Sequence, residues 1–132
     1  MKGKRNMPNT TESLEMYLEN ILVLQNTKGR VRSIDVAHIM GYSKPSVSRA
    51  VKLLVKDGCI GIDEDGFIIL TEKGKEIAVK ILDRHKIITD FFVLIGVDAE
   101  TATEDACRIE HVISDQTFRK LKALTNTLKK EN

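Results

Sequence analysis

The chain has 132 residues, a formal net charge of +2 and 30% charged residues, which suits one large domain or two small domains sharing a core. Two cysteines in such a chain argue against a disulfide framework. The longest apolar run, Phe91 to Val97, is too short to span a bilayer, and no apolar signal segment follows the basic N-terminus. We therefore expect a cytoplasmic protein with no membrane partner. The small net charge does not by itself indicate nucleic-acid binding.

The first predicted elements are two helices. Leucine and isoleucine recur at helical spacing over residues 11–26, and Lys28-Gly29 closes this helix. Ser33 can act as the N-cap of a short second helix over residues 34–40, which Gly41 ends.

A third helix, over residues 44–56, completes a helix-turn-helix pattern. Ser43 can cap it, and Pro45 is tolerated in its first turn. Two β-rich runs follow at residues 59–62 and 67–70, joined by an acidic turn that ends in glycine. A hairpin directly after a helix-turn-helix is a wing.

Three further helices are predicted in the remainder of the chain, over residues 72–95, 99–113 and 115–130. Asp98 and Ser114 can cap the second and third of these helices. The chain is therefore expected to be mainly α, with one small hairpin.

The third helix has the two sides expected of a helix that reads double-stranded DNA. Its apolar side consists of Val47, Ala50, Val51 and Leu54. Arginine can read guanine edges, while serine and lysine can hold phosphates or bases. The candidate DNA-binding residues are Ser43, Lys44, Pro45, Ser46, Ser48, Arg49 and Lys52. An ordinary solvated helix would carry similar charges, and it is the preceding helix and the wing that favour DNA reading.

The stretch Cys107-Arg-Ile-Glu110-His111 carries candidate metal ligands. In the predicted helix, positions i, i+3 and i+4 share one face, so a thiol, a carboxylate and an imidazole would lie together. These are good ligands for a divalent transition metal. Burying all three without partners would be costly, which argues against a purely structural role.

Three other residues can bring further ligands. Met16 and Glu19 share a face of the first helix, and His85 lies in the middle of the fourth. Each has an ordinary alternative, because a helical methionine often packs in a core and a lone histidine often has a structural hydrogen bond. A thioether and a thiolate in one site favour metals softer or later than manganese, so we expect Fe(II) in preference to Mn(II).

Five segments carry a resemblance to a known family: Ser13-Leu-Glu-Met-Tyr-Leu-Glu19, Gly41-Tyr-Ser-Lys-Pro-Ser-Val-Ser48, Leu70-Thr-Glu-Lys-Gly74, Arg84-His-Lys86 and Asp105-Ala-Cys-Arg-Ile-Glu-His-Val-Ile-Ser-Asp115. The chain resembles the diphtheria toxin repressor family of iron- and manganese-dependent repressors. The resemblance implies a winged helix-turn-helix DNA-binding domain over residues 1–72 and an all-helical metal-binding and dimerisation domain over residues 73–132. It also implies a metal bound between the first helix and the dimerisation helices.

Carried over by position, the effector-metal set of the iron-responsive members resembles Met16, Cys107, Glu110 and His111. Glu19 and His85 match positions that complete a second, adjacent metal in manganese-responsive members. The chain departs from both patterns. Thr89 and Thr103 stand where an iron-type ancillary site would have a carboxylate and an imidazole, and Cys107 replaces a bridging carboxylate of the manganese pattern. The chain also ends before the optional SH3-like domain of the family.

The resemblance implies a transcriptional repressor that is not an enzyme. Bound metal would promote binding of a homodimer to a double-stranded DNA operator, expected to be palindromic, and so control metal-homeostasis genes. Two alternatives stay open: a winged-helix regulator without metal control, and a thiol redox-sensing regulator that uses Cys107. A metalloenzyme is disfavoured because no nucleophile–base pair or cofactor motif is evident.

Overall fold

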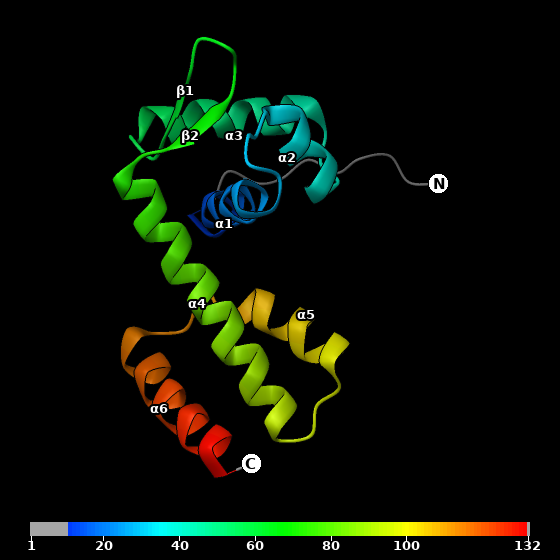
Figure 1. Ribbon diagram of the computed structural model, residues 1–132, viewed down its shortest axis with the longest axis vertical. Helices are drawn as coiled ribbons and strands as arrows, with labels where there is room; N and C mark the ends of the chain where they lie inside the picture. The colour runs from blue at the N-terminus through cyan, green and yellow to red at the C-terminus, as the bar shows by residue number, and fades with distance from the viewer. Residues whose placement is uncertain (1–10, 132) are drawn as a thin grey trace. The chain divides into compact units, whose positions relative to one another are not determined.

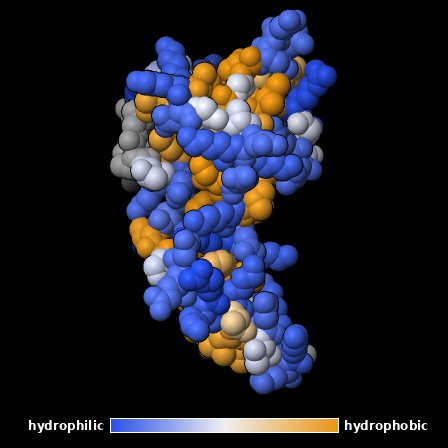
Figure 2. All heavy atoms as spheres, turned by 90° about the vertical axis from the view of Figure 1, so that its left-hand side faces the viewer, coloured by the Kyte–Doolittle hydropathy of each residue, from blue (hydrophilic) through white to orange (hydrophobic). Residues whose placement is uncertain are grey.

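The computed structural model describes residues 11–131, which divide into two compact units, one ending at Val79 and one beginning at Lys80 (Figure 1). The fold is mainly helical with one two-stranded sheet, as the sequence predicts. Within the described residues, no helix is long and apolar enough to cross a membrane. Figure 2 shows one face of the molecule, where hydrophilic side chains surround smaller hydrophobic patches.

The first unit is a winged helix built on α1 (Thr11–Lys28). This helix contacts α2 (Ser33–Met40), α3 (Lys44–Lys56) and the second strand of the hairpin. Its buried residues, which include Tyr17, Leu18 and Ile21, form part of the hydrophobic core. α1 ends two residues beyond the prediction.

The cap of α2 differs from the prediction. Ser33 is the first residue of the helix, and Arg32 is the N-cap. The Arg32 backbone N–H donates to Asp35 Oδ2 at 2.8 Å. The start of α2 is therefore held by a carboxylate three residues after the N-cap, and not by the expected serine hydroxyl. Lys28 also pairs with Asp35, and these two hydrogen bonds hold the pKa of that carboxyl below its usual value. Gly41 ends α2 with φ of 69°, as predicted.

The caps of α3 and the hairpin turn agree with the sequence. Ser43 Oγ accepts a hydrogen bond from the Ser46 backbone N–H at 3.3 Å. The strands β1 (Ile60–Ile62) and β2 (Ile68–Leu70) are antiparallel, and each begins one residue later than predicted. The Ile68 N–H donates to Val31 O at 2.7 Å, which ties the loop before α2 to this small sheet.

The helix α4 (Glu72–Leu94) begins two residues after the second strand of the hairpin. A Cβ atom at Gly74 would lie 1.9 Å from the carbonyl oxygen of Cys59, so only glycine allows this approach of helix to backbone. Thr71 adds a hydrogen bond from its hydroxyl to Gly58 O at 2.6 Å. The first turns of α4 therefore belong to the first unit.

The second unit contains the rest of α4 with α5 (Ala99–Ile109) and α6 (Asp115–Glu131). The predicted caps are confirmed, because Asp98 and Ser114 each accept a backbone hydrogen bond at 3.1 Å. The three helices share a small core of Ile87, Ile88, Ala106 and Phe118. α6 ends one residue later than predicted, whereas α5 is four residues shorter, and its end forms the candidate metal centre.

Candidate functional site

Four of the predicted ligands lie together in the second unit. His85 comes from α4, and Cys107 comes from the last turn of α5. His85 Nδ1 is 2.8 Å from Glu110 Oε2 and 3.7 Å from Cys107 Sγ. One ligand atom of each of these three residues lies within 4.8 Å of those of the others. His111 Nε2 lies 3.3 Å from the second carboxylate oxygen of Glu110, so this carboxylate joins the two imidazoles.

The predicted helix over residues 99–113 is wrong in its last turn. α5 ends at Ile109, Glu110 is its C-cap, and His111 lies in the turn that follows. Cys107, Glu110 and His111 therefore do not share the face of one regular helix. The turn still brings the Glu110 carboxylate to His85, which the helical spacing alone could not establish.

Arg84 holds the turn that follows α5, a role that we did not predict from the sequence. Its buried guanidinium donates to Glu110 O at 3.2 Å and to Ile113 O at 2.7 Å, and it pairs with Asp115. These contacts satisfy backbone carbonyls of the segment between α5 and α6. A signal was available, because Arg84 belongs to the Arg84-His-Lys86 segment that carries the family resemblance.

The cluster is shielded from water and strongly polar. The Glu110 side chain is 1% exposed, His111 2% and His85 23%. Hydrogen bonds to Cys107 and then to Glu110 raise the pKa of His85 to about 10, although burial opposes this change. Without a metal, the imidazolium is thus the positive partner of the thiol and the carboxylate.

The donor set fits a divalent transition metal. Metal–nitrogen and metal–sulfur bonds of about 2.0 to 2.3 Å place neighbouring ligand atoms roughly 3 to 4 Å apart, which the separations found here approach closely. An imidazole, a thiolate and a carboxylate on one small site match ions of intermediate softness. Met16 and Glu19 lie one turn apart on α1 in the first unit, and their part in the site stays a prediction.

The exposed side of α3 is the candidate DNA interface. Val47, Ala50, Val51 and Leu54 are buried, as predicted. Lys44, Pro45, Ser48, Arg49 and Lys52 are exposed, and Ser43 is half-buried. Ser46 is only 2% exposed, so its predicted place on the exposed side is wrong. It precedes the fully buried Ala50 by four residues and therefore lies on the same face.

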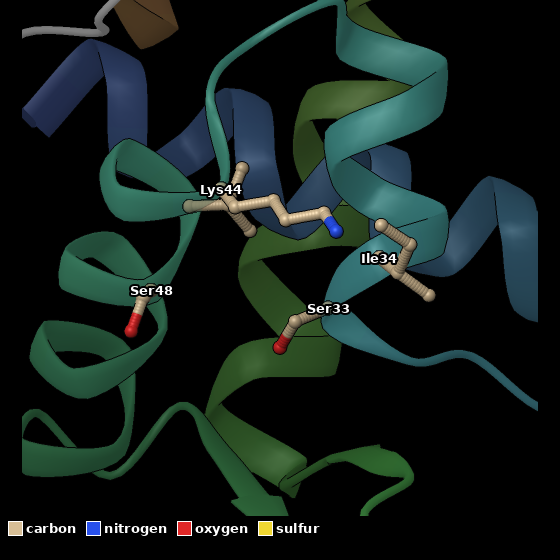
Figure 3. Close-up of a pocket in the computed structure, with 5 residues that line it drawn as sticks. Ser33, Ile34, Lys44 and Ser48 are labelled. Atoms are coloured by element: carbon tan, nitrogen blue, oxygen red, sulfur yellow. The ribbon is translucent and has the colours of Figure 1, made fainter.

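A cleft runs between α2 and α3 on this side of the unit. It is lined by Ser33 and Ile34 of α2 and by Lys44, Val47 and Ser48 of α3. Figure 3 shows the Lys44 side chain extending from α3 toward α2. The N-terminal end of α2 and the polar side of α3 therefore line the same cleft.

Comparison with known proteins agrees with this arrangement. Residues 9–66 match the iron dependent repressor N-terminal DNA binding domain, and residues 71–132 match the iron dependent repressor metal binding and dimerisation domain. An uncharacterized HTH-type transcriptional regulator of Methanocaldococcus jannaschii is 36% identical over 121 residues, which are 90% of this chain and 97% of that protein. The HTH-type transcriptional regulator MntR of Bacillus pumilus is 37% identical over 105 residues, covering 80% of this chain and 73% of its own.

Among solved structures, the manganese regulator SloR is similar with a TM-score of 0.77 and 28% identity. The alignment covers 86% of this chain and 53% of SloR, so this chain spans about half the length of that protein. The two matched domains follow each other in the order in which the winged helix and the metal-ligand cluster occur here. This chain therefore belongs to the iron-dependent repressor family, the diphtheria toxin repressor family, whose members are metal-dependent transcriptional regulators and not enzymes.

Proposed function

We propose that this chain represses transcription when a divalent transition metal is held by His85, Cys107, Glu110 and His111. The observation that carries the proposal is the convergence of the first three ligand atoms within 4.8 Å, in the domain that matches the family's metal-binding region. The repressor would bind a palindromic operator in cytoplasmic DNA as a homodimer. Two copies of α3 would then read two half-sites and control metal-homeostasis genes.

Fe(II) is the favoured metal, with Mn(II) next. The relatives support both ions, because the matched domains are described as iron dependent while SloR is a manganese regulator. Cys107 favours iron, since a thiolate suits softer and later metals than manganese. Zinc would bind such ligands more tightly than iron, so selection of iron would rest on geometry and on cellular supply.

Glu110 organises the proposed site. Its two carboxylate oxygens face different imidazoles, with Oε2 toward His85 and Oε1 toward His111. A bound metal would supply positive charge where the His85 proton supplies it otherwise. His85 must lose that proton, and Cys107 must become a thiolate, before either can act as a ligand. The site therefore exchanges protons for a metal ion and becomes more competent as the pH rises.

The family resemblance adds Met16 and Glu19 of α1 as further ligands, and this part of the proposal rests on their sequence positions. A ligand contributed by α1 would link metal binding to the helix on which α2 and α3 pack. Allosteric coupling of about 1–3 kcal/mol is typical, which corresponds to a change in operator affinity of roughly 5- to 150-fold.

Anaerobic titration with Fe(II), Mn(II) and Zn(II), followed by fluorescence anisotropy on DNA from the protein's own promoter, tests the proposal. We expect tighter DNA binding with one metal, reversed by a chelator and absent in Cys107→Ala. Equal DNA affinity with and without each metal would refute metal control and leave a constitutive winged-helix regulator. Loss of DNA binding under peroxide, without a metal requirement, would instead identify Cys107 as a redox sensor, a role that its 3.7 Å contact with His85 makes chemically reasonable.

A further inference from the structure

Two arginines share the ring of Phe67, the residue that directly follows the turn of the wing. The Arg32 guanidinium carbon lies 4.1 Å from the centre of the Phe67 ring, and that of Arg30 lies 5.0 Å from it. Val31, between them, is fully buried and accepts a hydrogen bond from Ile68 of β2. Because both guanidinium groups lie at this one ring, they leave the core on the same side.

Both cations are available to an anionic partner. Arg30 and Arg32 are exposed residues, and in the part of the chain that the structure describes neither guanidinium pairs with a carboxylate. Stacking on a ring occupies the face of a guanidinium and leaves its N–H edges free to donate. Two like charges over one ring repel each other, and a negatively charged ligand would relieve this repulsion.

The arginines adjoin the candidate DNA surface. Arg32 directly precedes Ser33, whose side chain lines the cleft between α2 and α3 together with Lys44 and Ser48 (Figure 3). The segment that carries the two arginines therefore leads directly into the α2 side of this cleft. Lys44, which extends from α3 toward α2, adds a third cation.

The turn of the wing, directly before Phe67, has the opposite charge. It contains Asp63, Glu64 and Asp65 in succession. Asp63 Oδ1 accepts hydrogen bonds from the backbone of Asp65 and Phe67, which fixes the turn from within. Three carboxylates would repel DNA phosphates, so this turn is unsuited to enter a DNA groove.

We propose that Arg30 and Arg32, held in place by Phe67, bind the phosphate backbone of DNA beside the bases read by α3. This inference rests on the proposed DNA-binding function and names a second contact surface for it. Phe67 acts as a positioning residue, because it restricts both side chains before DNA arrives. Phosphate contacts carry no direct sequence information, so these arginines add affinity and register without adding base preference.

The test is the salt dependence of DNA binding by the metal-loaded protein. Each lost phosphate contact lowers the slope of log affinity against log salt by about one. R30A/R32A should therefore lower that slope by about two for each bound subunit, equally on operator and on unrelated DNA. Arg119→Ala is the matched control, since it removes an exposed arginine of the second unit and should leave the slope nearly unchanged.

Phe67→Leu separates positioning from charge. It keeps an apolar side chain but removes the aromatic face, so it should weaken DNA binding in the wild-type background and have little further effect in R30A/R32A. Thermal melting checks that each variant folds, and R30Q/R32Q replaces the alanine variant if the latter melts early. The backbone N–H of residue 32 can still donate to Asp35 in all of them.

An unchanged salt slope in folded R30A/R32A, with metal-responsive operator binding retained, would overturn this inference and leave the proposed function standing. An equal effect of Phe67→Leu in both backgrounds would overturn the positioning role. If wild-type DNA affinity proved independent of metal, the proposed metal control would fail, and the slope comparison would still decide the role of the two arginines.

Discussion

Replacing Arg84 by methionine tests how the metal-ligand turn is held. Arg84 is 5% exposed and donates to the carbonyl oxygens of Glu110 and Ile113. It also pairs with Asp115 and lies with its guanidinium carbon 5.4 Å from the centre of the Phe118 ring. Methionine keeps most of the apolar stem and removes every donor, so the variant isolates the hydrogen bonds from the packing.

The expected loss follows from the two carbonyl contacts. A hydrogen bond that involves a charged group contributes about 1.5–3 kcal/mol, so two of them give about 3–6 kcal/mol. The pair with Asp115 adds little, because that side chain is 64% exposed and water screens it. The Ile113 contact is only partly buried, which favours the lower limit. We therefore expect the free energy of unfolding of the second unit to fall by about 3 kcal/mol.

Urea denaturation of the metal-free protein, followed by circular dichroism, measures this loss. Arg108→Met is the matched control, because Arg108 is an exposed arginine in the last turn of α5. Metal affinity of the Arg84 variant should also fall, because Arg84 holds the backbone carbonyl of Glu110, whose carboxylate is a proposed metal ligand. Equal urea midpoints for the two variants would refute the energetic reasoning. A destabilised variant with unaltered metal affinity would show that Arg84 does not position the ligands.

Four further predictions concern the metal ligands and the DNA-reading helix. Cys107→Ala and His111→Ala should each abolish metal-dependent DNA binding while the circular dichroism spectrum stays native, and a full metal response in either would remove that residue from the site. Arg49→Ala should weaken operator binding by about 5- to 150-fold at unchanged metal affinity, because a bidentate arginine–guanine pair is worth about 1–3 kcal/mol; unaltered operator affinity would place base reading elsewhere. Because the pKa of His85 is raised to about 10, metal affinity measured with a competing chelator should rise by up to about tenfold per pH unit between pH 6 and 8, and a flat profile would exclude His85 as a ligand. In the metal-free protein the stabilisation from His85 should be complete below about pH 6.5 and disappear as the pH rises through about 10, which unfolding midpoints across this range would show.

The elements that could be predicted from sequence are those fixed by neighbouring residues. Gly41, Ser43 and Gly66 act within a few residues of their own positions, and they mark the turn, the α3 cap and the hairpin correctly. The N-cap of α2 could also have been predicted from nearby residues. Asp35 stands three residues after Arg32, where a carboxylate can accept from the N-cap backbone.

The site was harder to predict because distant residues shape it. Arg84, which holds the turn after α5, lies 26 residues before Glu110, and nothing in the local sequence between Cys107 and His111 forbids another helical turn. The ligand types could be predicted, but their geometry could not. Ser46 is a different case, because its place four residues before Ala50 already put it on the buried side of α3, and its polarity misled the prediction.

The contact between Gly74 and Cys59 has a practical consequence for dissecting the protein into fragments. A DNA-binding fragment cut just after the hairpin would lose the Thr71 hydrogen bond and expose the backbone that Gly74 covers. The fragment should instead extend to Val79, where the first unit ends inside α4. Its new C-terminus would then be an exposed helix end, which tolerates truncation far better than a buried strand.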